Sequence, residues 1–445
     1  MQLLPCRITK KYLRTTIHYS SALLLTGCAA SIDATKDVQS AHSLAKEHLP
    51  VVIEEEHSWS ADKPLSVENA IAYALKHDAL LQRELAIIVQ RRAEIAQAEL
   101  PANPTITGAF GIAVDGLSGA PLVLQGIQNL SWLWTRPHKI ASAEHTLKRA
   151  ILSAANRTVG VVANVRIAHH EVTTGLKLIQ LANEDVELAS KILDITQKHV
   201  SAGEAAETEI DSATIAFLNS KHNLSKLQEQ FDNSLLNLLH AMGCPETQNV
   251  FFITQEQKTP QIHHSEESLL AYAIENRLDL AAQRATIEQR SAELGLANPP
   301  LISGSFMFNE NFNDRQAVSP GVGVTIALDG DAKEAVAQSI LKQEELSYID
   351  AMRTVIRDVR ILFDSFIASK EQSSLDETVL LTTEVSLKRA LEASNQGELH
   401  PLRLLPIERS VIQAKQELLR DELLVSTNAI KLEQAVGGTF KGMNQ

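Results

Sequence analysis

Histidines and carboxylates are the residues of this chain whose types most readily suggest chemistry. The sequence has 15 histidines, and the adjacent pairs His169–His170 and His263–His264 raise the question of a metal site. Neighbouring residues on a helix do not face each other, so they chelate one ion less well than residues three or four apart. The acidic run at 54–56 is typical of a solvated linker rather than of paired catalytic acids. We expect no metal and no cofactor.

Nucleotide and nucleic-acid chemistry are also disfavoured. The glycine-rich stretch at 321–330 lacks the third glycine of a dinucleotide-binding loop, and no Gly-Lys-Ser/Thr phosphate loop occurs. The net charge of -13 argues against nucleic acid, because binding phosphate backbones requires concentrated basic surface. The chain is therefore predicted not to be an enzyme and not to bind nucleic acid.

One cysteine suggests a covalent modification. Cys28 closes the stretch Leu25-Thr26-Gly27-Cys28, which follows a basic segment and a short apolar run typical of a secretory signal peptide. The four residues resemble the bacterial lipobox, after which the Cys28 thiol carries a diacylglyceryl thioether and becomes the mature N-terminus. Ala29 resembles the sorting preference for the outer membrane. The alternative is an ordinary thiol in a cleaved leader.

The elements that position any function come in two copies. Residues 66–110 can be laid on residues 265–306, and agreement over about 45 residues indicates an internal duplication. The matching positions are Ala72-Tyr73-Ala74 with Ala271-Tyr272-Ala273, Gln90-Arg91 and Glu94 with Gln289-Arg290 and Glu293, and an Ala-Asn-Pro at 102–104 with another at 297–299.

Each Ala-Asn-Pro is followed by alternating apolar and polar residues, which predicts β-hairpins at about 104–134 and 301–328. A small soluble β-layer with one buried face is the simpler interpretation. The functional interpretation is a lipid-facing sheet with aromatic residues near the interface. The residues expected to face the membrane are Phe110, Trp132, Trp134, Phe306, Phe308, Val324 and Ile326.

Long helices are predicted after both hairpins. No proline lies between Pro137 and Pro245, and neither glycine nor proline lies between Gly330 and Gly397. Such a stretch permits a helix of up to roughly 95 Å at 1.5 Å per residue. Breaks at 201–209 and 394–401 predict turns, with Gly203 and Gly397 available as helix caps, followed by return helices.

These patterns divide the chain into five predicted parts. They are a signal peptide at 1–27, a lipid-anchored linker at 28–60, a first repeat at 61–260, a second repeat at 261–438 and a tail at 439–445.

The order of helix, hairpin, long helix, turn and long helix, repeated twice, resembles the TolC-like outer-membrane efflux factor family. The closing stretch Ala435-Val436-Gly437-Gly438 is similar to the Ala-Leu-Gly-Gly ending of that family. The lipobox is similar to that of lipidated members serving resistance-nodulation-division pumps. The resemblance implies a passive trimeric channel in the outer membrane with a long periplasmic extension, working with a periplasmic adaptor and an inner-membrane pump.

The resemblance further implies that the two turns meet the adaptor and that acids near them form a pore mouth. Glu209 and Asp211 are the candidate acids after the first turn, whereas the second turn offers Arg403 and Pro406 in place of the usual acids. The gate is therefore expected to differ from that of other members.

Physical argument supports the same architecture. Four short strands cannot close a barrel, and open sheet edges are not tolerated in lipid, so a membrane role requires several chains to pool their strands. Three chains give about 12 strands, joined to a trimeric α-barrel of long helices, so the fold class is mainly α with a small β part. The alternative is an envelope-spanning coiled-coil structural or adaptor lipoprotein without its own barrel. The sequence does not specify the exported cargo.

Overall fold

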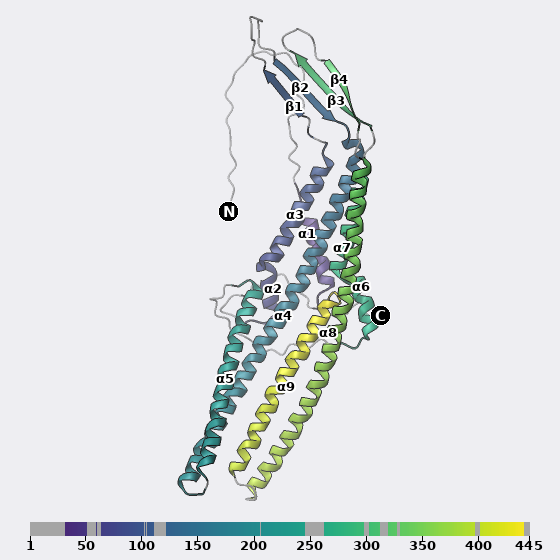
Figure 1. The fold of residues 1–445 in the computed structure, drawn as a ribbon. Helices are drawn as coiled ribbons and strands as arrows, with labels where there is room; N and C mark the ends of the chain where they lie inside the picture. Colours follow the sequence, from purple (N-terminus) through teal and green to yellow (C-terminus); the bar gives the residue numbers. More distant parts are fainter. Residues whose placement is uncertain are drawn as a thin grey trace, which may run out of the picture.

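The chain is elongated, with a β-sheet at one end and two helical turns at the other (Figure 1). A computed structural model describes residues 32–50, 59, 64–101, 103, 105–110, 122–204, 206–244, 262–297, 302–311, 319–326, 330–396 and 401–439.

The same six elements occur twice in the same order. The first set is α2 (Val67–His77), α3 (Ala79–Glu99), β1 (Thr105–Phe110), β2 (Leu122–Asn129), α4 (Trp132–Ser201) and α5 (Glu207–Met242). The second set is α6 (Glu266–Asn276), α7 (Leu278–Ala297), β3 (Ile302–Asn311), β4 (Ser319–Ile326), α8 (Gly330–Asn395) and α9 (Pro401–Ala435). Both return helices predicted from the sequence are present, and the first turn is formed as predicted; residues 397–400 of the second turn lie outside the described residues.

Two helices span the whole helical part. α4 has 70 residues and α8 has 66, which corresponds to about 100 Å at 1.5 Å per residue. α4 packs against α3 and α5 on one side and against α7 and α9 on the other, and α8 packs against α7 and α9. The chain therefore forms a wall one helix thick, in which α5, α4, α9 and α8 follow one another across its lower half (Figure 1).

In each repeat, the end of the return helix meets the end of a short helix. α5 meets α2 in the first repeat, and α9 meets α6 in the second. α5 ends at Gly243, whose left-handed backbone (φ 67°) brings it so close to His77 that a Cβ would lie 2.7 Å from the His77 carbonyl oxygen. Gly437 (φ 101°) follows the end of α9, and a Cβ there would lie 3.2 Å from the Asn276 carbonyl carbon and from the Arg277 nitrogen. With Tyr73 aligned on Tyr272, the peptide between His77 and Asp78 corresponds to the peptide between Asn276 and Arg277, so the duplication is preserved in the tertiary contacts.

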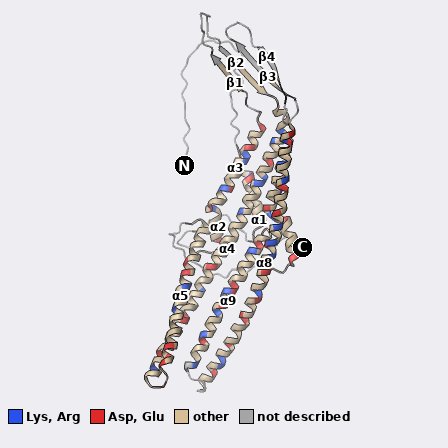
Figure 2. Cartoon of the chain, in the orientation of Figure 1, with Lys and Arg blue, Asp and Glu red and all other residues tan. Residues whose placement is uncertain are grey.

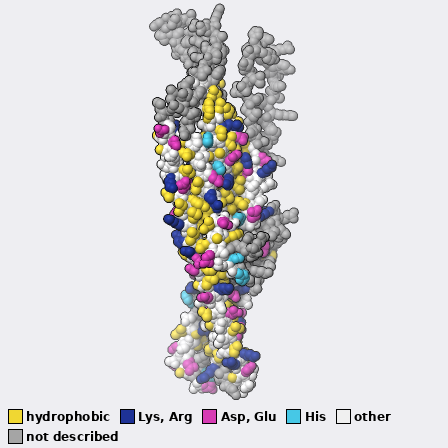
Figure 3. All heavy atoms as spheres, turned by 90° about the vertical axis from the view of Figure 1, so that its right-hand side faces the viewer, with side chains coloured by type: hydrophobic (Ala, Val, Ile, Leu, Met, Phe, Trp, Pro, Cys, Tyr) yellow, Lys and Arg dark blue, Asp and Glu magenta, His cyan; other side chains and the backbone are white. Residues whose placement is uncertain are grey.

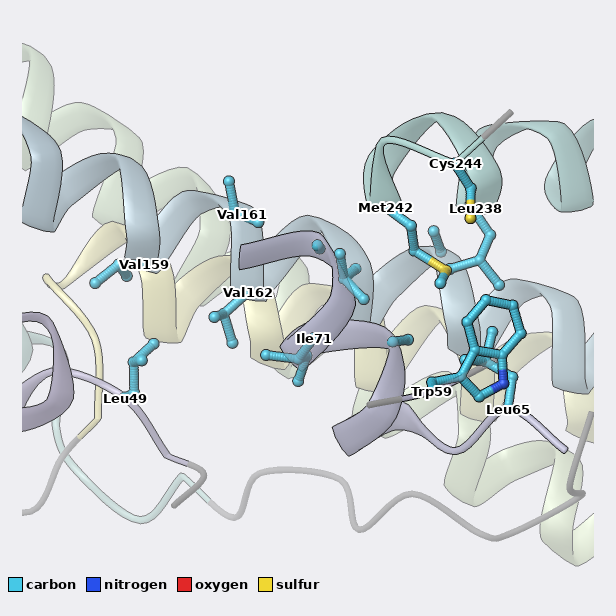
Figure 4. Close-up of a cluster of buried hydrophobic side chains, with 14 of the residues drawn as sticks. Leu49, Trp59, Leu65, Ile71, Val159, Val161, Val162, Leu238, Met242 and Cys244 are labelled. Atoms are coloured by element: carbon cyan, nitrogen blue, oxygen red, sulfur yellow. The ribbon is translucent and has the colours of Figure 1, made fainter. Parts of the chain in front are cut away.

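The main hydrophobic core lies at the first of these junctions (Figure 4). Ile71 of α2, Val162 of α4 and Leu238 of α5 are fully or almost fully buried there. Trp59 also belongs to this cluster, with its ring edge-on to Tyr73 at 5.6 Å between centroids. An equivalent cluster joins α6, α8 and α9 around Leu269, so each repeat has a core of its own.

A helix that the sequence analysis did not foresee lies in the predicted linker. α1 (Thr35–Glu47) packs on α4, burying Ala41 and Ala45. Its buried Asp37 accepts two hydrogen bonds from Arg92 of α3, with 2.6 Å between Nε and Oδ2. The stretch following the predicted lipidation site is therefore attached to the helical wall.

The predicted end of the first hairpin was wrong. β2 ends at Asn129, and Trp132 and Trp134 lie in the first turn of α4 rather than in a strand. Pro137 is the sixth residue of α4, so its missing N–H removes one i→i−4 hydrogen bond. The helix nevertheless begins before the proline, and Leu133 and Trp134 already donate backbone hydrogen bonds to the carbonyls three residues earlier.

Candidate functional site

The sheet has one predominantly apolar face. Its strand order is β1-β2-β3-β4, all antiparallel, so the two hairpins pair through β2 and β3. Paired residues share a face of the sheet, and the register aligns Phe110 with Leu122, Phe306 with Val322 and Ile302 with Ile326. The large apolar strand positions on this face are Ile106, Phe110, Leu122, Leu124, Ile302, Phe306, Phe308, Val322, Val324 and Ile326. The same face also holds Gly108, Gly126, Gly304 and Pro320, and two polar positions, Gln128 and Glu310.

The opposite face is more polar. It carries Thr107, Gln125, Ser303 and Thr325, with a few apolar positions such as Met307. Five of the seven residues expected to face the membrane, namely Phe110, Phe306, Phe308, Val324 and Ile326, therefore occupy one face of a single sheet.

The sheet is open. Among the described strands, β1 pairs only with β2 and β4 pairs only with β3, so each keeps an edge without a partner strand. Unpaired backbone N–H and C=O groups along such edges can hydrogen-bond to a strand of another chain.

The end of α4 and the start of α5 lie beside the end of α8 and the start of α9, at the end opposite the sheet (Figure 1). Gly203 follows α4 with a left-handed backbone, φ 78°, as expected for a helix cap. Its N–H donates to the Val200 carbonyl at 3.0 Å, and the N–H of Glu204 donates to the His199 carbonyl at 2.9 Å, which is the Schellman pattern. Gly397, in the other turn, lies outside the described residues.

The candidate pore-mouth acids are exposed at the start of α5. Glu209 and Asp211 lie in its first two turns, and Figure 2 shows acidic residues close to the α4–α5 turn. Acidic side chains also favour a helix N-terminus through its partial positive charge, so their position has a structural explanation as well. Nearby, His199 and Glu204 form a contact across the turn, with 2.6 Å between Nδ1 and Oε2.

A buried polar network, not foreseen from the sequence, ties α9 to the first repeat above these turns. Arg409 of α9 hydrogen-bonds with Asp185 of α4, at 2.7 Å from Nε to Oδ1, and with Ser220 of α5, at 2.7 Å from Nη2 to Oγ. The side chain of Asp185 is only 6% exposed. The network therefore links three helices near the tip.

Exposed apolar side chains line both edges of the wall. On the α8 edge, which faces the viewer in Figure 3, hydrophobic side chains form a broad band. The large exposed hydrophobic residues of α8 are Val336, Leu346, Ile349, Ile361, Ile367, Leu375, Val379, Leu381, Val385 and Leu391. Those of α3 and α5, on the other edge, are Leu80, Val89, Ile215, Leu218 and Leu236. Exposed apolar patches of this extent mark interaction surfaces.

The histidine pair of α4, His169 and His170, is packed within the protein. The His169 Nε2 atom lies 3.3 Å from the Leu65 carbonyl oxygen, and burial lowers the pKa of His169. Burial and the neighbouring His169 lower the pKa of His170 to about 4, so the ring is neutral at pH 7. Within the described ranges, no three His, Cys, Asp or Glu side chains come together as a metal site. His263 and His264 precede α6.

Two features of the chain bear on its contact with a membrane, the predicted lipid anchor and the hydropathy of the helices. Cys28 lies outside the described residues. In the part of the chain that is described, every helix is too short or too polar to pass through a lipid bilayer.

Comparison with known proteins gives a family match over part of the chain and a shared fold. Residues 71–244 match the family model described as outer membrane efflux protein. That segment includes β1, β2, α4 and α5. No curated protein sequence matches the chain.

Several solved structures share the fold at low sequence identity. A membrane protein from Pseudomonas aeruginosa is 16% identical, with a TM-score of 0.70 over 88% of this chain and 95% of that one. The outer membrane protein VceC from Vibrio cholerae is 14% identical, with a TM-score of 0.66 over 84% of this chain and 97% of that one. The CmeC outer membrane channel of Campylobacter jejuni is 13% identical, with a TM-score of 0.62 over 99% and 96%.

Proposed function

We infer that this chain, a member of the TolC-like outer-membrane efflux factor family, is the outer-membrane channel component of a tripartite efflux or export system. One observation carries this function: the same chain has an open sheet with one apolar face and a helical wall with apolar side chains along both edges. Both parts are incomplete in one chain, and both can be completed by copies of the same chain.

Three copies would complete the channel. Placing the α8 edge of one copy against the α3–α5 edge of the next gives a head-to-tail contact that closes into a ring when the rotation permits. The open edges of β1 and β4 would pair between neighbours at the same time, giving a transmembrane barrel of 12 strands, four from each chain. The helical parts would form a continuous α-barrel extending into the periplasm.

The polypeptide is proposed to divide as its sequence predicts. Residues 61–260 and 261–438 would be the two structural repeats, preceded by a signal peptide at 1–27 and an anchored segment at 28–60. Acyl chains on Cys28 would hold the mature N-terminus in the outer membrane. Intact-mass analysis of the mature protein should show an acylated N-terminal Cys28, and a mature chain that begins elsewhere without lipid would refute the anchor.

The tip is proposed as the contact for a periplasmic adaptor, which in turn binds an inner-membrane pump. Gly203 and Gly397 would hold the two turns that meet the adaptor. Glu209 and Asp211, repeated three times around the axis, would form an acidic ring that attracts cations. Replacing both acids by Ala should change cation selectivity or resting conductance in single-channel recordings, and unchanged recordings would remove them from the gate.

Two measurements test the channel against the adaptor lipoprotein. Mass measurement in detergent should give three subunits, whereas a monodisperse monomer that still conducts would contradict the trimer. The Cys28→Ala variant should still need detergent for extraction, because the sheet itself contacts lipid. An adaptor held only by its lipid would become soluble.

A further inference from the structure

The internal duplication relates each residue of α4 and α5 to one residue of α8 and α9. Gly243 and Gly437, the left-handed glycines that follow α5 and α9, are equivalent, and the same separation in sequence applies along both helical hairpins. It pairs buried core residues of the two repeats, namely Val161 with Val355, Val165 with Val359, Val172 with Phe366 and Leu238 with Leu432. Burial therefore supports this register independently of the sequence match.

Within one chain, the two repeats meet where α9 packs on α4. Arg409 of α9 binds Asp185 of α4, and further along α9 Leu419 packs on the cluster that includes Ala182 of α4. Gln416 lies between these two contacts on the same side of α9, and it is only 5% exposed. The α4–α9 junction therefore shows how one repeat packs against the next.

In the proposed ring of copies, the equivalent junction lies between α8 of one copy and α5 of the next. The exposed side chains of α5 agree with this. The large exposed hydrophobic residues of α5 are Ile215, Leu218 and Leu236, which are equivalent to Arg409, Ile412 and Ile430 of α9. Those three α9 residues recur with Gln416 at the spacing of one side of a helix, the side that packs on α4. The matching side of α5 is therefore apolar and uncovered in the single chain.

The facing position on α8 is apolar as well. The residue of α8 that is equivalent to Asp185 is Val379, which is 50% exposed. The polar contact of Arg409 with Asp185 inside the chain thus corresponds to an apolar contact of Ile215 with Val379 between copies. Both positions differ in the same sense, so the two exposed side chains are complementary.

Two acids occupy apolar positions at the same junction. Asp376 of α8 and Asp421 of α9 are the equivalents of Ala182 and Leu227, which are buried together in the first repeat. Burial, followed by a hydrogen bond with Asp376 and the charges of Asp376 and Glu417, raises the pKa of Asp421 to about 6, so the two carboxyl groups lie close together. The Oδ2 atom of Asp421 is buried, whereas Asp376 is partly exposed and is the member of the pair that a neighbouring copy can reach.

His222 is the residue that the register brings to Asp376. It is equivalent to Gln416, so in the next copy it would lie at the level of Val379 and Asp376 on α8. His222 is exposed on α5, as is Lys226 one turn further along the same side. An imidazole N–H can donate to a carboxylate, and both side chains can carry positive charge opposite the two acids.

We propose that His222 of one copy hydrogen-bonds with Asp376 of the neighbouring copy, so that the pair of Asp376 and Asp421 is completed only when copies assemble. The positive charge of Lys226 offsets the repulsion between the two acids. A shift that brought Leu218 to the acids instead would leave them without a donor, so the contact selects the axial register of the ring. The site rests on the ring of the proposed function and adds the residues that align its subunits.

Disulfide trapping tests the contact between copies. The full-length His222→Cys/Asp376→Cys variant, oxidised in detergent, should form disulfide-linked trimers. The link must join different copies, because α5 and α8 lie at opposite edges of the wall (Figure 1). His222→Cys/Thr378→Cys is the matched control, since Thr378 is also exposed but lies on the other side of α8 at almost the same level. This control should link about tenfold less, and each single-cysteine variant should not link.

Exchanging the two residues tests the bond itself. His222→Asp places a third carboxylate beside the pair and should lower the trimer fraction in detergent about tenfold. His222→Asp/Asp376→His restores a donor and an acceptor across the junction and should recover most of the trimer. Gln228→Glu is the control, because it also adds one negative charge to an exposed position of α5, equivalent to Glu422, which is exposed on α9. It should leave the trimer fraction unchanged, and circular dichroism verifies that each variant keeps its helical content.

The outcomes separate this site from the channel itself. Linking of the His222→Cys/Asp376→Cys variant, together with recovery of the trimer by the exchange, supports the site. If the unchanged protein is a trimer but these cysteines do not link, or the exchange does not recover assembly, the site is wrong and the channel function stands. If the unchanged protein forms no trimer, both the site and the channel function are wrong.

Discussion

Arg409 of α9 binds Asp185 of α4 through two hydrogen bonds, 2.7 Å from Nε to Oδ1 and 3.1 Å from Nη2 to Oδ2. The pair joins the second repeat to the first, because α4 belongs to one and α9 to the other. The same guanidinium also donates to Ser220 of α5. The Arg409 network therefore adds polar contacts to an apolar cluster, Leu178, Leu227 and Leu419, that joins the same three helices.

Arg409→Ala should loosen the tip without unfolding the rest of the wall. The substitution leaves Asp185 buried without a partner, which costs about 3 kcal/mol. Hydrogen exchange of the amides of α4, α5 and α9 around the network should accelerate, while exchange around the core at Leu238 stays slow.

Arg420→Ala is the matched control, because among the described residues Arg420 bonds only to Glu417, on its own helix. Exposed pairs of this kind contribute little, so exchange at the tip should not change. If the two variants exchanged alike, the Arg409 network would not hold the hairpins together.

Charged residues on the apolar face of the sheet should impair membrane insertion. Val324→Asp and Ile326→Asp place a carboxylate on the face that carries Phe306 and Phe308, and a charge near the bilayer midplane costs on the order of 2 kcal/mol. The fraction of protein in the outer membrane, measured after fractionation, should fall. Thr325→Asp, on the opposite face, should insert normally, and equal damage from it would mean that the face is assigned the wrong way round.

Gly203→Val should weaken efflux through backbone strain alone. A left-handed conformation costs about 1 to 2 kcal/mol for a residue with a side chain, and a Cβ at this position meets nothing within 4 Å. Drug or metal efflux assays should show the loss while the proposed trimer still assembles. Gly203→Asn should be much milder, since Asn tolerates this conformation. Loss of the trimer in either variant would assign the glycine to folding instead of docking.

The stability of the α8–α9 pair should depend on pH through Asp421. Burial, followed by a hydrogen bond with Asp376 and the charges of Asp376 and Glu417, raises the pKa of Asp421 from 3.8 to about 6. The folded state therefore binds the proton more tightly than the unfolded state. The protonated Asp421 therefore adds to the free energy of unfolding at low pH, and this addition is lost as the pH rises from 3.8 to about 6.

Asp421→Asn should remove that dependence. Its thermal unfolding midpoint, followed by far-UV circular dichroism, should exceed that of the unchanged protein above pH 6 and match it near pH 4. Asp331→Asn alters an exposed carboxylate at the start of α8 and serves as the control. A midpoint difference that is the same at both pH values would exclude Asp421 as the source.

Much of the fold could be predicted from the sequence because it follows from local signals. The matching segments of the duplication form the same contacts in both copies: Arg91 with Glu94, and Arg290 with Glu293. Gly203 ends a helix in the left-handed conformation, as its position after a long uninterrupted stretch implied. Alternation along single strands was sufficient to place Phe306 and Val324 on one face.

What could not be predicted depends on long-range contacts or on competing signals. The stretch from Leu130 to Trp134 has apolar residues at every second position, which fits a strand, but its backbone joins α4. Arg409 and Asp185 are 224 residues apart, and no local pattern brings them together. α1 did carry a signal, since Val38, Ala41 and Ala45 recur at helical spacing, but its many polar residues resembled a linker.

The pairing of β2 with β3 has a consequence for symmetry. These central strands belong to different repeats, so each chain already contains the kind of junction that the proposed trimer would form between chains, from β4 of one copy to β1 of the next. In that arrangement the ring alternates between covalently fused and non-covalent junctions around a pseudo-sixfold axis. Because the two repeats are fused in one chain, only half of the junctions in the ring must form by association of separate chains. Fusion also allows the two repeats to diverge, with acids at one turn and Arg403 at the other.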